Sequence, residues 1–243
     1  CGMVPAALDT GITFFALAFA AGLLHGFGAD HALAMAAAMP DRPSWRAALG
    51  VGVKFGIGHS VAIVLLGLAP FALGLAIPAD VWAGVERGLG ALLVVLGATM
   101  LLRLAGARPT LHAHEHTHNP ETESEEPHRH WHLHLVAHAT EKPHASHAHP
   151  HGVWALGLVF GLGGVSALVP HLESLAPATL VLTGLAFAIL FGLGVTTTMV
   201  AVALTIRGAD RALAHKPALH KGVHAAVAIA SVAVGLSMAV SLI

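Results

Sequence analysis

The sequence predicts an all-α integral membrane protein of six transmembrane helices, arranged as two inverted three-helix repeats that are joined by a histidine-rich cytoplasmic loop. Three observations support this prediction: the scarcity of charged residues, the spacing of long apolar segments, and a glycine motif present in both halves. Only 10% of the 243 residues are charged and 56% are hydrophobic, whereas soluble domains carry about 25% charged residues. We therefore expect a lipid bilayer to surround the chain.

Six apolar segments approach or exceed the roughly 20 residues that a helix needs to cross a bilayer. They cover residues 11–39, 47–77, 81–104, 153–170, 178–205 and 223–243. We divide the chain accordingly into a first three-helix repeat (1–104), a disordered histidine-rich loop (105–152) and a second three-helix repeat (153–243). The net charge of −1 gives no indication of a nucleic-acid partner.

Basic residues predict the orientation of these helices. Ten of the twelve lysines and arginines lie in or beside the first, third and fifth connections, and such residues gather on the cytoplasmic side of a membrane. These three connections, including the histidine-rich loop, are therefore predicted to be cytoplasmic. Both termini of this multi-pass protein of the cell (inner) membrane would lie outside.

The first apolar segment is too long for one straight span. Its 29 residues would extend about 43 Å as a helix, against about 30 Å for the hydrocarbon core. The segment must tilt or break, and Gly26 and Gly28 mark the expected break.

A glycine motif around this break recurs in the second half. Residues 22–28 (GLLHGFG) resemble residues 157–163 (GLVFGLG) at an offset of 135, and residues 55–58 (FGIG) resemble residues 191–194 (FGLG) at an offset of 136. Because each half contains three predicted spans, the second half would be inserted upside down. Inverted repeats with interrupted helices are typical of transporters, although glycines at such spacing also serve helix packing alone.

Four polar side chains in the first two segments are candidate metal ligands: His25, Asp30, His31 and His59. Ionisable residues at membrane depth usually mark a pathway or a partner, and imidazole with carboxylate suits nickel, cobalt or zinc. On a regular helix Asp30 would point roughly 140° away from His25, and His31 roughly 100° away from Asp30. The three side chains therefore converge only if the helix unwinds at its glycines. The alternative is an ion pair between Asp30 and Lys54, with histidines that only pack helices.

The second half lacks these ligands. At the corresponding positions it has four other residues, namely Phe160, Val165, Ser166 and Val195. Ligand chemistry is therefore predicted to be confined to the first half. The hydroxyls of Ser166 and Thr196–Thr198 are possible weaker ligands, unless they bond to carbonyls of their own helix.

Residues 25–31 (HGFGADH) fit the H-x4-D-H signature of the nickel/cobalt transporter (NiCoT) family, and residues 49–60, which end in Gly58-His59-Ser60, resemble its second-helix segment. The resemblance covers residues 20–66. It implies transport of Ni²⁺ or Co²⁺ as substrate, without a prosthetic group, with His25, Asp30, His31 and His59 handling the metal. Six spans match the shorter, exporter-like relatives, and the acidic motif of the longer importers is missing, so import and efflux both stay open.

The predicted loop is a second metal-related feature. Residues 111–151 contain thirteen histidines, and histidine-rich tracts bind transition metals. The accompanying acidic residues and prolines predict disorder. The tract would serve either as a regulatory sensor or as a low-affinity metal buffer.

Three alternatives to nickel or cobalt transport stay open at this stage: a Zn²⁺ transporter, a membrane metallochaperone and a metal buffer without net transport. We expect no enzyme, because no general base stands beside a position for metal-bound water. Homo-oligomerisation is compatible with the sequence. His171 and Glu173, at the outer turn after the fourth segment, are interpreted as capping or solvated turn residues, with an entry or exit ligand pair as the alternative. The other histidines outside the loop, His215, His220 and His224, are interpreted as ordinary loop and helix-end residues.

Overall fold

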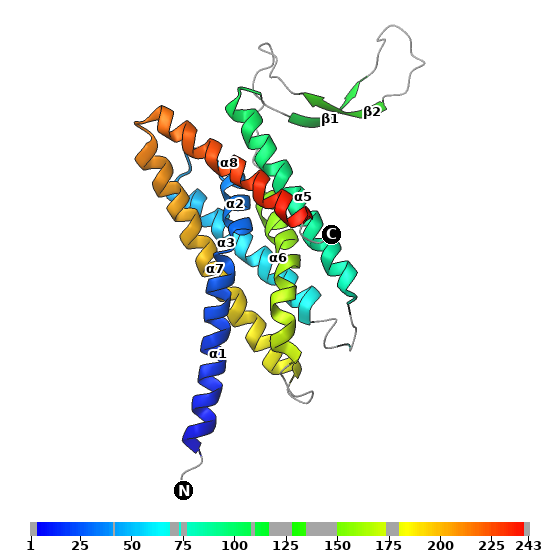
Figure 1. Cartoon of the computed structure of the whole chain (residues 1–243), viewed down its shortest axis with the longest axis vertical. Helices are drawn as coiled ribbons and strands as arrows, with labels where there is room; N and C mark the ends of the chain where they lie inside the picture. Colours follow the sequence, from blue (N-terminus) through cyan, green and yellow to red (C-terminus); the bar gives the residue numbers. More distant parts are fainter. Residues whose placement is uncertain are drawn as a thin grey trace.

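The computed structural model describes residues 4–40, 42–68, 73, 77–107, 110–116, 128–134, 150–173 and 180–240. Apart from one pair of strands, these residues form helices (Figure 1). In chain order the elements are α1 (Val4–Gly26), α2 (Ala29–Ala38), α3 (Trp45–Ala62), the π-helical turn η1 (Ile63–Leu68), α5 (Ala79–Leu104), β1 (Thr110–His116), β2 (His128–His134), α6 (Pro150–Glu173), α7 (Leu180–Leu213) and α8 (Pro217–Val240).

Four helices in the described part are long and apolar enough to cross a membrane, and a fifth span results if the bent pair α1 and α2 is counted as one. The predicted segment 153–170 corresponds to α6. Its apolar part Gly152–Val165 is shorter than a full span and is therefore not among these four or five. Large apolar side chains such as Leu24 and Leu182 point outward, with exposed fractions of 75% and 78%, as expected of a surface that lipid covers.

The predicted break in the first segment is confirmed. Helix α1 ends at Gly26, α2 begins at Ala29, and the two axes are bent by 59°. Gly28 has extended backbone with ψ of 136°. A Cβ at this position would lie 2.6 Å from Asp30 Oδ1, so a larger residue here would displace the Asp30 carboxylate.

The connection between α7 and α8 is much shorter than predicted. The predicted apolar segments end at residue 205 and begin again at residue 223, but α7 continues to Leu213 and α8 begins at Pro217. The polar residues 207–213 (RGADRAL) include good helix formers, and proline is favoured at the first position of a helix. The ends of the two helices therefore form a tight helical hairpin.

The expected disorder of the histidine-rich loop does not hold for two segments. Strands β1 and β2 pair antiparallel, and histidine stands opposite histidine at three positions of the register: His112 and His132, His114 and His130, His116 and His128. Alternation of histidine with other residues has the period of a β-strand. The rest of the predicted loop lies outside the described residues, apart from residues 105–107 after α5 and the start of α6.

The helices of the two halves are packed on one another in a reciprocal way. Helix α1 lies along α7, α3 along α6, and α5 along α8. A Cβ at Gly22 of α1 would overlap the carbonyl of Phe191 in α7, and a Cβ at Gly157 of α6 would overlap the carbonyl of Phe55 in α3. In Figure 1, α1 and α7 run upward from the N-terminal end of the molecule, whereas α3 and α6 run downward.

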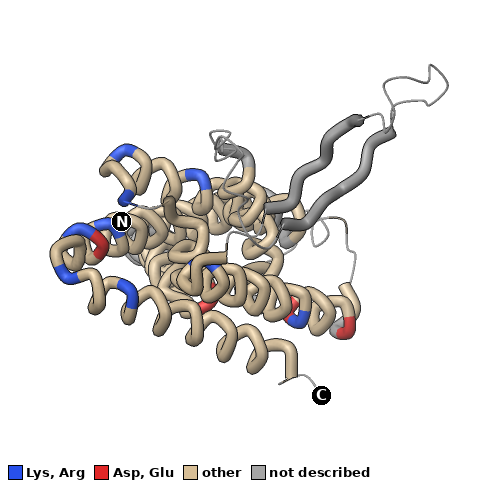
Figure 2. Tube along the Cα trace, turned by 90° about the horizontal axis from the view of Figure 1, so that it is seen from above, with Lys and Arg blue, Asp and Glu red and all other residues tan. Residues whose placement is uncertain are grey.

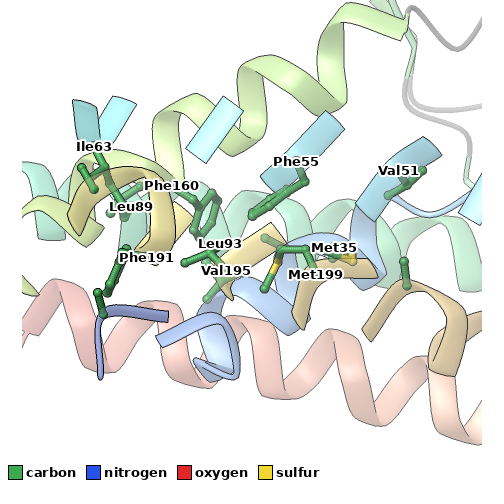
Figure 3. Packing of buried hydrophobic residues seen from close by; sticks show 14 of the residues in the cluster. Met35, Val51, Phe55, Ile63, Leu89, Leu93, Phe160, Phe191, Val195 and Met199 are labelled. Atoms are coloured by element: carbon green, nitrogen blue, oxygen red, sulfur yellow. The ribbon is translucent and has the colours of Figure 1, made fainter. Parts of the chain in front are cut away.

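The buried core lies where these pairs of helices meet. It contains large apolar side chains from both halves (Figure 3), among them Met35, Phe55, Phe160, Phe191 and Met199. The break between α1 and α2 lies next to this core, so its polar groups are enclosed by apolar neighbours.

Candidate metal site

Three of the four predicted ligands converge at the break between α1 and α2. His25 lies in the last turn of α1, His31 in the first turn of α2, and His59 on α3. Their candidate ligand nitrogens all lie within 4.8 Å of one another. The ring centroids are separated by 5.0 Å (His25 and His31), 5.3 Å (His25 and His59) and 4.8 Å (His31 and His59).

Most of the nitrogens that face one another in this group are buried without hydrogen-bond partners. His59 and His31 expose only 0% and 3% of their surface, and His25 is half-buried. In the described part of the chain, Nε2 of all three rings and Nδ1 of His59 make no hydrogen bond. A buried polar atom without a partner costs about 1–3 kcal/mol. A bound cation would satisfy these nitrogens, and no described protein group does.

Asp30 is not a fourth member of this group. Its Oδ1 accepts a hydrogen bond of 2.8 Å from Nδ1 of the neighbouring His31. Such a contact fixes the ring and leaves Nε2 as the free lone pair, which is the usual arrangement behind a metal-binding histidine. Lys54 is exposed, and the structure records no ion pair between it and Asp30 in the described part, so that alternative is not supported.

A glycine of the second half provides the space between the rings. A Cβ at Gly164 of α6 would lie 2.9 Å from Nε2 of His59 and 3.1 Å from Nε2 of His25. Sequence analysis missed this residue. The available signal was the extra glycine after the repeated motif, because Gly164 corresponds to Ala29 of the first half at the offset of 135.

Aromatic side chains surround the three histidines. The ring centroid of His31 lies 6.1 Å from that of Phe55 and 5.9 Å from that of Phe160, and His25 lies 5.4 Å from Phe191. Phe55 and Phe160 are seen close together in Figure 3. These rings make the surroundings of the site apolar, and a cation–ligand interaction is stronger there than in water.

The positions of the second half that correspond to the ligands serve packing. Phe160, Val165 and Val195 are fully buried in the apolar core, while the side chain of Ser166 lies outside the described residues. The hydroxyls of Thr196 and Thr197 bond to carbonyls of their own helix at 2.8 Å. Thr198 instead donates to the carbonyl of Leu23 across the helix interface at 2.9 Å.

One further group of metal-ligand side chains is present among the described residues, at the ends of α7 and α8. It consists of Asp210, His220 and His224. The sequence alone had indicated ordinary turn and helix-end histidines here. The side chains of His171, Glu173 and the loop histidines lie outside the described residues.

Comparison with protein families gives a match over almost the whole chain. The profile of the NicO family, described as "High-affinity nickel-transport protein", matches residues 11–243. This range contains all six predicted apolar segments and all three histidines of the buried group. The searches of curated proteins and of solved structures found no match.

Proposed function

We propose that this chain, which belongs to the NicO family of high-affinity nickel-transport proteins, carries Ni²⁺ across the membrane. The site of transport would be formed by His25, His31 and His59. One observation supports this site above all others. Three imidazoles whose Nε2 atoms are buried and unpaired face one another at the break of a membrane helix. The metal is the substrate of this site.

The donor set suits a transported metal. Neutral imidazoles bind nickel, cobalt and zinc, and three protein ligands leave coordination positions open for release to the next site. Asp30 acts from behind His31, because its carboxylate accepts a hydrogen bond from the Nδ1–H group of that ring. The description of the family indicates Ni²⁺ as the substrate. Co²⁺ prefers the same ligands, so we expect it to compete with Ni²⁺ for the site.

We further propose that the protein consists of two inverted three-helix repeats with six spans in total, divided at residues 104 and 153. The reciprocal contacts at Gly22 and Gly157 support this arrangement. So do the opposite directions of α1 and α6 and of α3 and α7 (Figure 1). A site between halves that can rock against each other is the usual basis of alternating access.

The proposed orientation rests on the basic residues. Figure 2 shows several of them around the connection of α7 and α8, where Arg207, Arg211, Lys216 and Lys221 lie. By the positive-inside rule this end faces the cytoplasm. The histidine-rich loop would then be cytoplasmic and both termini outside.

The test is the accumulation of ⁶³Ni in cells that express the chain, compared with a His25→Ala variant and a His215→Ala control. His215 is exposed and outside both groups of ligands. Raised accumulation that His25→Ala abolishes would establish import, and lowered accumulation that it abolishes would establish efflux. Equal accumulation by the wild-type chain and by His25→Ala would overturn the proposed site.

Deletion of residues 111–151 distinguishes transport from buffering. A transporter keeps flux through the His25 site without the loop, although its metal dependence can change. If the deletion removed the whole nickel effect while His25→Ala left it intact, the protein would be a metal buffer rather than a transporter.

A further inference from the structure

We propose a second, solvent-accessible site for a divalent transition metal at the helical hairpin of α7 and α8, with Asp210, His220 and His224 as ligands. The two histidines are one turn apart on α8 and the aspartate lies near the end of α7. This site is separate from the buried group at the break of α1 and α2, and its existence does not depend on the transport function proposed above.

The distances match a metal-binding arrangement. Asp210 Oδ1 lies 2.5 Å from His220 Nε2 and 3.5 Å from His224 Nε2, and the two imidazole centroids are 4.4 Å apart. All three ligand atoms lie within 4.8 Å of one another. Tetrahedral coordination with bonds of about 2.1 Å separates neighbouring ligand atoms by about 3.4 Å. Small rotations of the three side chains would therefore place an ion between them.

The backbone holds these ligands in place before any ion binds. Only residues 214–216 separate the two helices. The turn is closed by backbone hydrogen bonds from Ala214 to Arg211 and from Lys216 to Leu213, and His220 donates to the carbonyl of Lys216. Histidines at positions i and i+4 share one face of a helix, which is also the spacing by which helical zinc sites present two imidazoles.

A simple structural contact between Asp210 and His220 explains only part of this geometry. One hydrogen bond between these side chains would join the two helices, and it requires only one imidazole. The second imidazole, that of His224, also turns its Nε2 toward the same carboxylate oxygen. Two nitrogens directed at one carboxylate form a two-histidine, one-carboxylate set, which suits nickel, cobalt and zinc better than magnesium or calcium.

Exposure and charge predict that metal at this site exchanges with the solution. The side chains of His220 and His224 are 34% and 33% exposed, and that of Asp210 is 12% exposed, so water can complete the coordination. Four basic residues lie nearby in sequence: Arg207, Arg211, Lys216 and Lys221. Their charge weakens cation binding compared with an acidic surface.

Asp210 lies twelve residues after Thr198 on α7, so the surface site is about 18 Å along the helix from the level of the buried site.

Chemical modification of histidines in the full-length protein in detergent tests this site despite the many loop histidines, because each residue is read separately by mass spectrometry. The reagent is diethyl pyrocarbonate and the probe is Ni²⁺, with Mg²⁺ as the control ion. We expect saturating Ni²⁺ to slow the modification of His220 and His224 at least tenfold and to leave the exposed His215 unchanged. Equal modification of His220 and His224 with and without Ni²⁺, or equal protection of His215, would overturn the proposal.

Two variants separate a metal ligand from a structural contact. Asp210→Asn keeps an oxygen acceptor for His220 but removes the charge, and we expect at least tenfold more Ni²⁺ to be needed for half-protection. An unchanged half-protection concentration in this variant would rule out the carboxylate as a ligand. His224→Ala leaves the Asp210–His220 contact in place, and Ni²⁺ should then protect His220 at least tenfold less well; full protection would count against the site.

The same measurement in the His25→Ala variant keeps the two proposals apart. Protection of His220 and His224 should persist there, because the buried site is elsewhere on the chain. If transport fails but this protection is found, the surface site stands alone. If His25→Ala removes the protection, Ni²⁺ reaches the surface residues only through the buried site, and the claim of a separate site is wrong.

Discussion

The two groups of ligands use the same kinds of side chain in opposite surroundings. In the buried group the carboxylate of Asp30 lies behind the histidines and the nitrogens face one another among aromatic rings. In the surface group the carboxylate of Asp210 lies between the histidines and all three side chains reach water. Solvent can hydrogen-bond to the surface nitrogens when no metal is bound, whereas the described part of the chain offers no partner to Nε2 of the three buried rings. We therefore expect changes at the buried group to have the larger effects on transport.

Removal of a buried ligand should have the largest effect. His59→Ala removes a fully buried imidazole that, in our proposal, is one of three metal ligands, and we expect the initial rate of ⁶³Ni transport in proteoliposomes to fall to the background of empty vesicles. His215→Ala should keep the wild-type rate. A His59→Ala rate within about threefold of wild type, at equal reconstituted amounts, would contradict the assignment of the buried group.

Neutralising the residue behind the ligands should have the next largest effect. Asp30→Asn keeps an acceptor for His31 but removes the negative charge, and changes of this kind cost about 10–100-fold in metal affinity. We expect the Ni²⁺ concentration for half-maximal transport to rise by that factor, while the maximal rate changes less. A loss in maximal rate alone would mean that Asp30 acts in a later step than binding.

The space between the buried rings can be filled without removing any ligand. Gly164→Ala would place a methyl group 2.9 Å from Nε2 of His59 and 3.1 Å from Nε2 of His25, so the rings must turn away from the metal position. We expect about a tenfold loss of nickel affinity, or about 1.4 kcal/mol. In the matched control Gly163→Ala, the new methyl meets only the flexible end of Leu89 at 2.8 Å, and affinity should be retained.

The sequence predicted the buried group of histidines better than the surface group for a physical reason. His25, Asp30 and His31 are polar residues in an apolar segment, so they stand out, and Gly26 and Gly28 indicate the break that brings them together. The match of the NicO profile over residues 11–243 confirms the family resemblance seen over residues 20–66. The polar residues and the two glycines all lie within residues 25–31, so both signals can be recognised in a short stretch of sequence.

The contributions of the second half could not be found in the same way. Gly164 differs little from other helix-packing glycines until its distance to the imidazoles is known. Asp210 and His220 stood in a stretch that was predicted to be a loop, and only the tight hairpin of α7 and α8 places them together. Residues whose role depends on contacts between helices leave only a weak signal in a single sequence, such as the extra glycine at position 164.

The smallest expected effect concerns how the second half supports the break. Thr198 of α7 donates to the carbonyl of Leu23 in the last turn of α1, where the interrupted helix leaves carbonyls without intrahelical donors. Thr198→Val should lower the free energy of unfolding by about 1 kcal/mol, which corresponds to a decrease of about 2–4 °C in melting temperature. The neighbouring Thr197→Val is the matched control, because the exposed Thr197 hydroxyl bonds only within its own helix.

Equal shifts of the melting temperature in the two variants, measured by thermal unfolding in detergent, would show that the contact between α7 and α1 adds nothing to the stability of the break. A shift confined to Thr198→Val, with ⁶³Ni transport slowed only modestly, would indicate that the ligand-free half stabilises the geometry in which the buried histidines converge.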